Sequence, residues 1–385
     1  MNKQTLALMA AGCGLLLPGI HIEAAELCAT NSTELQQHLA AAGTNGEETT
    51  IRIAAGDYPA PSSGFHFIGH DGQDLTLVGG YSEIFSNPCG QVLDDTPYTT
   101  SLDGEGGEPI ITLRFVDGSA GDILIRRLTF RNGATSTNSA AGIDIGPTQV
   151  GQSYEGVITI EKNAFLHNQG GEHNAALRVG QFTTAFNGNS SVRIINNLFF
   201  ANESGTCPAA RIIMTDGNTD SGIYVTNNTI VNNTTNDDLG AFCANLGVGR
   251  LFIANNNMSS NDVADLAVFI DEGATEVTYS LFNNNIGIRE GSEPTNDEGN
   301  LNIEPAYEPC TLGLLQCVAQ PPRFVPLPDS PLVDAGRHPR GLEPGWFLTN
   351  SDLIDQPRID AVGERVDIGA FESHARMFVD RFEGP

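Results

Sequence analysis

The sequence predicts an all-β fold, a single-domain parallel β-solenoid. Three observations predict it: four columns of similar residues recur in six consecutive segments, apolar residues alternate within each segment, and the lengths between segments vary. The segments begin at Ile123, Val157, Val192, Ile223, Leu251 and Val277. Short strands of constant length joined by variable loops fit coils that stack at the ~4.8 Å spacing of neighbouring strands.

Two kinds of side chain define three of the columns, and the fourth is a β-branched residue five positions before the anchor. A large apolar anchor recurs once in each segment, at Phe130, Phe165, Phe199, Ile230, Met258 and Phe282. Three positions later the first segment has Gly133 and the others have asparagine, at Asn168, Asn202, Asn233, Asn261 and Asn285. A second asparagine column precedes the anchor by two positions, at Asn163, Asn197, Asn228 and Asn256. We expect the anchors to stack inside the solenoid and the asparagines to form structural ladders along its turns.

The remaining chain divides around these coils. We assign 1–24 to a signal peptide, 25–50 to an N-terminal cap, 51–285 to about ten coils, 286–329 to an irregular Pro/Gly-rich segment and 330–385 to a C-terminal cap and tail. Caps are expected because the ends of a solenoid expose strand edges and apolar core. The N-terminal cap contains a short helical pattern with Ser32 or Thr33 as its N-cap.

The first residues have the pattern of an export signal. Lys3 is followed by an apolar stretch and by small residues around Ala24. Acylation at Cys13 is the alternative, but Ala10 stands where a lipoprotein signal usually has leucine. No later stretch approaches the ~20 apolar residues of a membrane span. We therefore expect a secreted or cell-surface protein.

The cysteines favour disulfides over metal or redox chemistry. Six remain after loss of Cys13, and an even number in an exported chain is typical of disulfide pairing. Among the possible connectivities, pairing of near neighbours gives Cys28–Cys89, Cys207–Cys243 and Cys310–Cys317.

The charge excludes several classes of partner. Nineteen Lys and Arg stand against 47 Asp and Glu, a formal net charge of −28. Such a surface repels nucleic-acid phosphates and anionic lipid. We interpret the charge as a solubility coat and expect a monomer.

Two stretches resemble a known family. The entry comprises IRIAAGDYPAP from Ile51, LTLVGGYSEIF from Leu75 and ILIRRLTFRNG from Ile123, and the exit comprises residues 330–336, 355–358 and 367–372. Together they resemble secreted bacterial right-handed parallel β-helix proteins, in particular those with a choice-of-anchor Q domain. The resemblance spans about 51–372 and implies a right-handed solenoid closed by caps. Within the exit we expect Arg358 to fix the fold by bridging Asp334, Asp360 or Glu372.

The chemistry in the coils is sparse. Asp144 and Arg178 lie at outward positions of adjacent rungs, and His167, Glu172 and His173 lie in the loop between those rungs. These residues are the candidates for general acid–base catalysis, but we interpret Asp144 and Arg178 as an exposed cross-strand ion pair.

Calcium is the cofactor that remains open. Asp237, Asp238, Asp262 and Asp265 lie on loops and are candidate Ca²⁺ ligands, although they match no known spaced calcium loop. Solvated acidic loops are the simpler interpretation, and no cofactor is firmly implied.

Two functions follow from these expectations. The first is an exported, non-catalytic β-helix with a surface-binding or adhesion role toward an extracellular polysaccharide or cell-surface component. The alternative is a Ca²⁺-dependent polysaccharide lyase or a glycoside hydrolase, because parallel β-helices also carry such enzymes and the fold alone does not decide.

Overall fold

The computed structural model gives the arrangement of most of the chain. It describes residues 24–70, 72–83, 87–116, 121–149, 151–180, 185–186, 190–217, 219–235, 239–262, 264–272, 274, 276–308, 323–338, 346, 348–358 and 365–373. The expected signal peptide (apart from Ala24), the Cys310–Cys317 pair, Asp360 and the C-terminal tail lie outside these residues.

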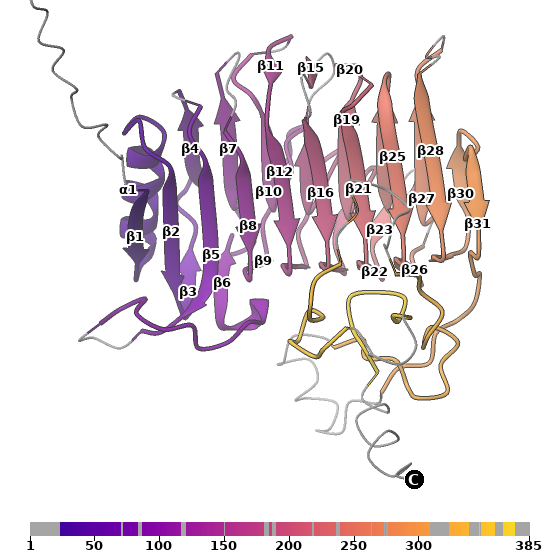
Figure 1. The fold of residues 1–385 in the computed structure, drawn as a ribbon. Helices are drawn as coiled ribbons and strands as arrows, with labels where there is room; N and C mark the ends of the chain where they lie inside the picture. The colour runs from indigo at the N-terminus through magenta and orange to yellow at the C-terminus, as the bar shows by residue number, and fades with distance from the viewer. Residues whose placement is uncertain are drawn as a thin grey trace, which may run out of the picture.

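The protein is a right-handed parallel β-helix with three long sheets that run side by side along its length (Figure 1). Sheet A has ten strands: β1 (Ala25–Ala29), β2 (Thr49–Ala54), β5 (Leu75–Tyr81), β8 (Ile123–Arg126), β12 (Val157–Glu161), β16 (Ser191–Ile195), β21 (Gly222–Thr226), β25 (Gly249–Ala254), β28 (Val277–Phe282) and β31 (Asn296–Glu298).

Sheets B and C have eight strands each. Sheet B consists of β3 (Gly56–Pro59), β6 (Thr100–Asp103), β9 (Thr129–Arg131), β13 (Ala164–Leu166), β17 (Leu198–Phe200), β22 (Thr229–Val231), β26 (Asn257–Ser259) and β29 (Asn285–Ile286). Sheet C consists of β4 (Phe65–Gly69), β7 (Ile111–Phe115), β10 (Ile143–Pro147), β14 (Leu177–Val179), β19 (Ala210–Met214), β24 (Phe242–Leu246), β27 (Leu266–Ile270) and β30 (Arg289–Gly291).

The loops carry smaller elements. Short strands of the loops from sheet C to sheet A pair as β11 (Ser153–Tyr154), β15 (Ala185–Phe186) and β20 (Asp216–Gly217). Loops from sheet B to sheet C pair through β18 (Glu203–Ser204) and β23 (Thr234–Thr235). A 3₁₀ turn, η1 (Pro97–Thr99), precedes β6.

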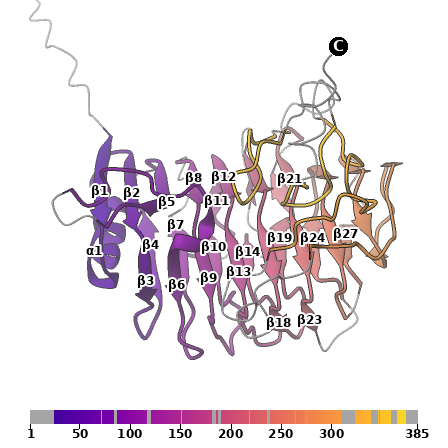
Figure 2. The ribbon, with the colours of Figure 1, turned by 90° about the horizontal axis from the view of Figure 1, so that it is seen from below.

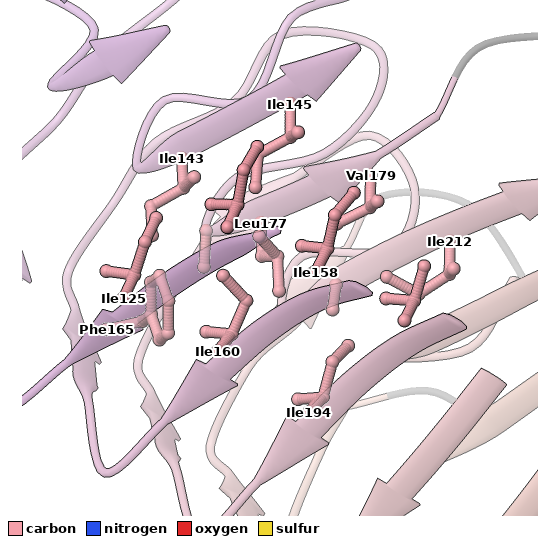
Figure 3. Close-up of a cluster of buried hydrophobic side chains, with 14 of the residues drawn as sticks. Ile125, Ile143, Ile145, Ile158, Ile160, Phe165, Leu177, Val179, Ile194 and Ile212 are labelled. Carbon is pink, nitrogen blue, oxygen red and sulfur yellow. The ribbon is translucent and has the colours of Figure 1, made fainter. Parts of the chain in front are cut away.

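The core is a stack of apolar side chains enclosed by the three sheets. Figure 3 shows Ile143 and Ile145 of sheet C facing Ile158 and Ile160 of sheet A, with Phe165 contributed by sheet B. All five side chains are fully buried. Period-two alternation therefore describes these strands well, because alternate residues point into the solenoid.

The anchor column stacks in register along sheet B. The rings of Phe130 and Phe165 lie 5.2 Å apart and those of Phe165 and Phe199 lie 4.6 Å apart. Ile230 and Met258 continue the column. This confirms the expected internal stack over five of the six segments.

In the last segment the prediction of Phe282 as the anchor is wrong, because the anchor is Ile286, four residues later. Met258 pairs with Ile286, whereas Phe282 pairs with Ala254 on the outer face of sheet A. With Phe282 as the anchor, Asn285 stands three positions later. With Ile286 as the anchor, Asn284 stands two positions earlier. Both alignments therefore fit an asparagine column, and the sequence pattern does not distinguish them. Asn285 is consequently outside the ladder to which it was assigned, and its amide binds Asn257 and the carbonyl of Ile303.

Two asparagine ladders close the turns on either side of sheet B. The first contains Asn163, Asn197, Asn228, Asn256, Asn284 and Asn300, and the second contains Asn168, Asn202, Asn233 and Asn261. In both ladders a side-chain oxygen accepts the backbone N–H of the asparagine one coil earlier at 2.8–3.1 Å. Bonds of this kind satisfy buried turn backbone, so the ladders are structural.

The N-terminal end is covered by α1 (Ser32–Ala42). Its N-cap is Asn31, not Ser32 or Thr33, because the Asn31 side chain accepts the N–H of Glu34 at 3.0 Å. Glu34 in turn accepts the N–H of Thr30, which completes a reciprocal cap. Leu35 and Leu39 of the helix are fully buried against the first coils.

The expected C-terminal cap packs along the side of the solenoid. We call residues 330–338, 346, 348–358 and 365–373 the strap. In both views it lies beside the coils, not across their end (Figures 1 and 2). It follows the edge between sheets A and B, where it bonds to Lys162, Asn196, Asn255 and Asn283.

Two of the three expected disulfides are present. Cys28–Cys89 ties the first strand to the loop after β5, and Cys207–Cys243 joins the loop before β19 to β24. Each closes a local stretch of chain, as the sequence predicted.

Candidate functional site

The predicted pair Asp144 and Arg178 is formed, and it includes a third residue. Asp144 in β10 stands in register with Arg178 in β14, and Arg178 donates from Nε to Oδ1 at 2.6 Å and from a terminal nitrogen to Oδ2 at 2.8 Å. Arg114 in β7 donates to Oδ2 from the other side at 2.5 Å. The carboxylate of Asp144 is thus held between two guanidinium groups.

The prediction of an exposed ion pair is wrong in one respect. The Asp144 side chain is 0% exposed, and those of Arg114 and Arg178 are 20% and 11% exposed. Asp144 points away from the apolar core, but the two long arginine side chains cover it. A buried carboxylate that accepts hydrogen bonds from two guanidinium groups is held far more strongly than a carboxylate in an exposed ion pair.

A third guanidinium group continues the row. Arg211 in β19 stands directly beside Arg178, and its Nε bonds to the amide oxygen of Asn245 in β24 at 3.4 Å. Burial lowers the pKa of Arg211, and the neighbouring charge of Arg178 lowers it further. We call Arg114, Arg178 and Arg211 the arginine cluster.

The loops before β10 and β19 border this cluster. Arg178 donates to the carbonyl of Asn138 at 2.7 Å, which fixes its guanidinium against the loop of the preceding coil. Cys243 stands in register beside Arg211, and its disulfide holds Cys207 at the end of the row. The cluster is therefore built on rigid strands and bounded by a cross-linked loop.

The predicted histidines are engaged elsewhere in these loops. His173 Nδ1 lies 2.8 Å from Thr206 Oγ1 in the loop of the next coil. His167 has a left-handed backbone (φ 54°) at the turn before Asn168, and its ring packs edge-on against Phe200. Burial lowers the pKa of His167. Both imidazoles have structural partners.

A shallow groove lies along the same loops. It encloses about 370 Å³ and is lined by 169–172 and 203–205. Glu172 is one of its walls, so the structure places this predicted residue in a loop groove. A second acid, Glu203, lines the groove together with Gln169, Ser204 and three glycines.

The calcium candidates do not form a metal centre among the described residues. Asp237 and Asp238 lie outside those residues, and Asp262 is exposed. Asp265 is 6% exposed and accepts from Asn261 Nδ2 at 2.8 Å and from the Gly287 N–H at 2.7 Å. Burial raises its pKa, and its bonds end the second asparagine ladder. No group of three His, Cys, Asp or Glu in the described chain is arranged to hold a metal ion.

Sequence reasoning missed Arg114 and Arg211. The signal for Arg211 was present, because ARIIM occupies the same rung as AALRVG one coil earlier. Arg114 lies two positions further along its strand than the residue aligned with Asp144, so only the length of its side chain brings it into contact.

Comparison with known proteins adds no relative: no protein-family model, curated protein or solved structure matches this chain. Within the described residues, no helix is both long enough and apolar enough to cross a bilayer.

Proposed function

We propose that the protein is an exported, non-catalytic parallel β-helix, similar to proteins with a choice-of-anchor Q domain, that binds an extracellular polysaccharide or cell-surface component. Asp144 carries this proposal. Its two oxygens accept from Arg114 and Arg178, and its side chain has no exposed surface. A general acid or base must reach a proton of the substrate, and this carboxylate is enclosed.

The construction of the scaffold supports a binding role. Rigid coils present successive loops at regular spacing, which suits contact with an extended partner. The disulfides Cys28–Cys89 and Cys207–Cys243 fit an oxidising compartment outside the cytoplasm. Export and anchoring at a surface are part of the proposal.

The alternative is a polysaccharide lyase or glycoside hydrolase. It is favoured by one observation, the position of Arg178 beside a carboxylate on the outer face of a sheet. A lyase of this kind would need a free base and, for Ca²⁺, several oxygen ligands. Arg178 has bonds from Nε and from both terminal nitrogens, which opposes a role as base.

Turnover separates the two functions. Purified protein is incubated with a panel of neutral and acidic polysaccharides, with and without Ca²⁺, and reducing ends and the absorbance of unsaturated products are followed. We expect no turnover of any polymer. Turnover that is lost in Arg178→Ala and kept in Arg289→Ala would contradict the proposal, since Arg289 forms an exposed pair with Asp297 at the end of the same sheet.

A further inference from the structure

We infer that the outer face of sheet C at the arginine cluster binds the carboxylate or sulfate groups of an acidic polysaccharide. The inference rests on the proposed binding function and names its ligand class. It depends on the local charge, the rigidity and the placement of Arg114, Arg178 and Arg211.

The charge of the cluster is opposite to that of the molecule. The whole chain has a formal charge of −28 and only 19 Lys and Arg. Three of those arginines meet on adjacent strands beside one carboxylate, Asp144, which bonds to Arg114 and Arg178. The exposed arginines Arg289 and Arg337 each pair instead with one exposed acid, Asp297 and Glu298.

Placing Arg178 beside Arg211 costs stability in the free protein. Like charges directly opposite one another on neighbouring strands repel. The pKa of Arg211 is lowered partly by the charge of Arg178, which reports the same repulsion. An oxyanion that contacts both groups would relieve it, so a bound anion and this arrangement stabilise each other.

Asp144 orients the cluster for such contacts. Two bonds to Arg178, one to Arg114 and the bond from Arg178 to the Asn138 carbonyl fix both planar groups. Guanidinium groups held in this way present remaining N–H donors to carboxylate or sulfate without further loss of side-chain freedom. Pre-ordered donors reduce the entropic cost of binding.

The acidic surroundings restrict the ligand to one of moderate charge density. A nucleic acid would meet the remaining negative surface along its whole length. A polysaccharide places its charged groups on separate sugars, and at physiological ionic strength charges more than about 8 Å apart are largely screened. The cluster spans strands β7, β10, β14 and β19, so an extended chain lying across the coils meets the three guanidinium groups in turn.

Binding is measured by isothermal titration at 0.15 M salt with polygalacturonate, alginate and chondroitin sulfate. Fully methyl-esterified polygalacturonate is the neutral ligand control. We expect saturable binding to at least one acidic polymer and about tenfold or greater weakening with the neutral ester, because a charge-assisted hydrogen bond contributes about that much. The carboxylate and sulfate arms show which oxyanion is preferred.

The matched variants are Arg211→Ala and Arg289→Ala, which remove one positive charge each from the same sheet. Arg211→Ala leaves both bonds of Arg178 to Asp144 in place, and thermal unfolding checks its fold. We expect about tenfold or greater loss of affinity for Arg211→Ala and less than twofold change for Arg289→Ala.

Three results would overturn the inference: no binding to any acidic polymer, equal affinity for the neutral ester, or unchanged affinity in Arg211→Ala. Binding of a neutral polysaccharide that Arg211→Ala leaves unchanged would overturn it while the proposed function stands. Cleavage of a polymer would instead contradict the proposed function, and the effect of Arg211→Ala on affinity would still decide the inference.

Discussion

Individual residues show how a strongly acidic chain uses its few cations. Lys162 is 2% exposed and donates to Asp95 at 2.5 Å and to Ser351 of the strap at 2.6 Å. Arg127 also bonds to Asp95, and these cations lower the pKa of that carboxyl in spite of its burial. Asp144 is held in the same way by Arg114 and Arg178. Cations therefore fix carboxylates at particular points of the solenoid.

The strength of the Asp144 site is testable by removal of its carboxylate. Asp144→Ala leaves Arg114 and Arg178 close together without their shared partner, so we expect a loss of about 3–5 kcal/mol in the free energy of unfolding. Asp297→Ala is the control, because Asp297 and Arg289 are 39% and 38% exposed and such pairs contribute at most about 1 kcal/mol. Urea denaturation followed by circular dichroism measures both. Equal losses would show that Asp144 behaves as a surface pair.

The pairing of Asp144 with Arg178 could be predicted from the sequence, but the burial of the Asp144 carboxylate could not. Period-two alternation places both on the outer face, and outer residues of a sheet are commonly exposed. Burial of Asp144 results from the diagonal reach of Arg114 across the sheet and from the loop carbonyl of Asn138. Neither contact follows from spacing along the chain, because both depend on the register between coils.

At the scale of elements, the strap is held by an unusual group of buried charges. Arg358 is 1% exposed, and it donates to Glu372 at 2.7 Å and to the side chain of Asn196. Asp352 and Asp367 are also buried, at 0% and 1% exposed. Of the three acids expected to pair with Arg358, Glu372 is the partner, whereas Asp334 donates its backbone N–H to Asp367. Glu372 forms the ion pair with Arg358, whereas Asp352 and Asp367 accept the backbone N–H groups of Glu372 and Ser373.

This arrangement makes attachment of the strap dependent on pH. Burial, aided by the neighbouring carboxylates, raises the pKa of Glu372 to about 8 and that of Asp367 to about 6 against the opposing charge of Arg358. The folded state therefore holds protons that the unfolded state releases, and stability decreases as pH rises from about 4 through 8. Trp346, the single tryptophan, packs on Phe252 at the strap and reports the change.

Between pH 6 and pH 9 we expect the emission of Trp346 to shift to the red, or the midpoint of thermal unfolding followed by this emission to fall. Glu372→Gln removes the titrating group and keeps an oxygen for Arg358, so its pH dependence should be flatter. Glu298→Gln is the control, since Glu298 is exposed and pairs with Arg337 of the same strap. An equally steep dependence in Glu372→Gln would contradict this account.

The elements also show where sequence reasoning reached its limit. Ladder asparagines and anchors identified the coils because every coil repeats the same local contacts. The strap has no repeat, and its position depends on contacts such as Gly369 with Asn255 and Ala370 with Thr229, more than 100 residues apart. Turn-forming residues in 330–336 and 367–372 indicated a compact segment but not the surface on which it packs.

At the scale of the whole molecule, the features that repeat from coil to coil form the scaffold, and the proposed binding site lies outside them. The core, the ladders and the turns recur in every regular coil, and they account for the fold that the sequence predicted. Arg178 and Arg211 are equivalent in successive coils, but the next coil has Cys243 at that position and Arg114 lies two positions further along its strand. On a chain of charge −28 this cluster brings three cations to the outer face of sheet C, and the strap lies along another edge of the solenoid.

The central claim is that this face binds an acidic polysaccharide without cleaving it. Hydrogen–deuterium exchange of the protein with and without a uronic acid oligomer tests it most directly, with the oligomer analysed by mass spectrometry in the same sample. We predict slower exchange in β10, β14, β19 and the loops that precede β10 and β19, unchanged exchange in the strap, and an intact oligomer. Protection confined to sheet A or the strap, or an oligomer converted to shorter products, would contradict the account.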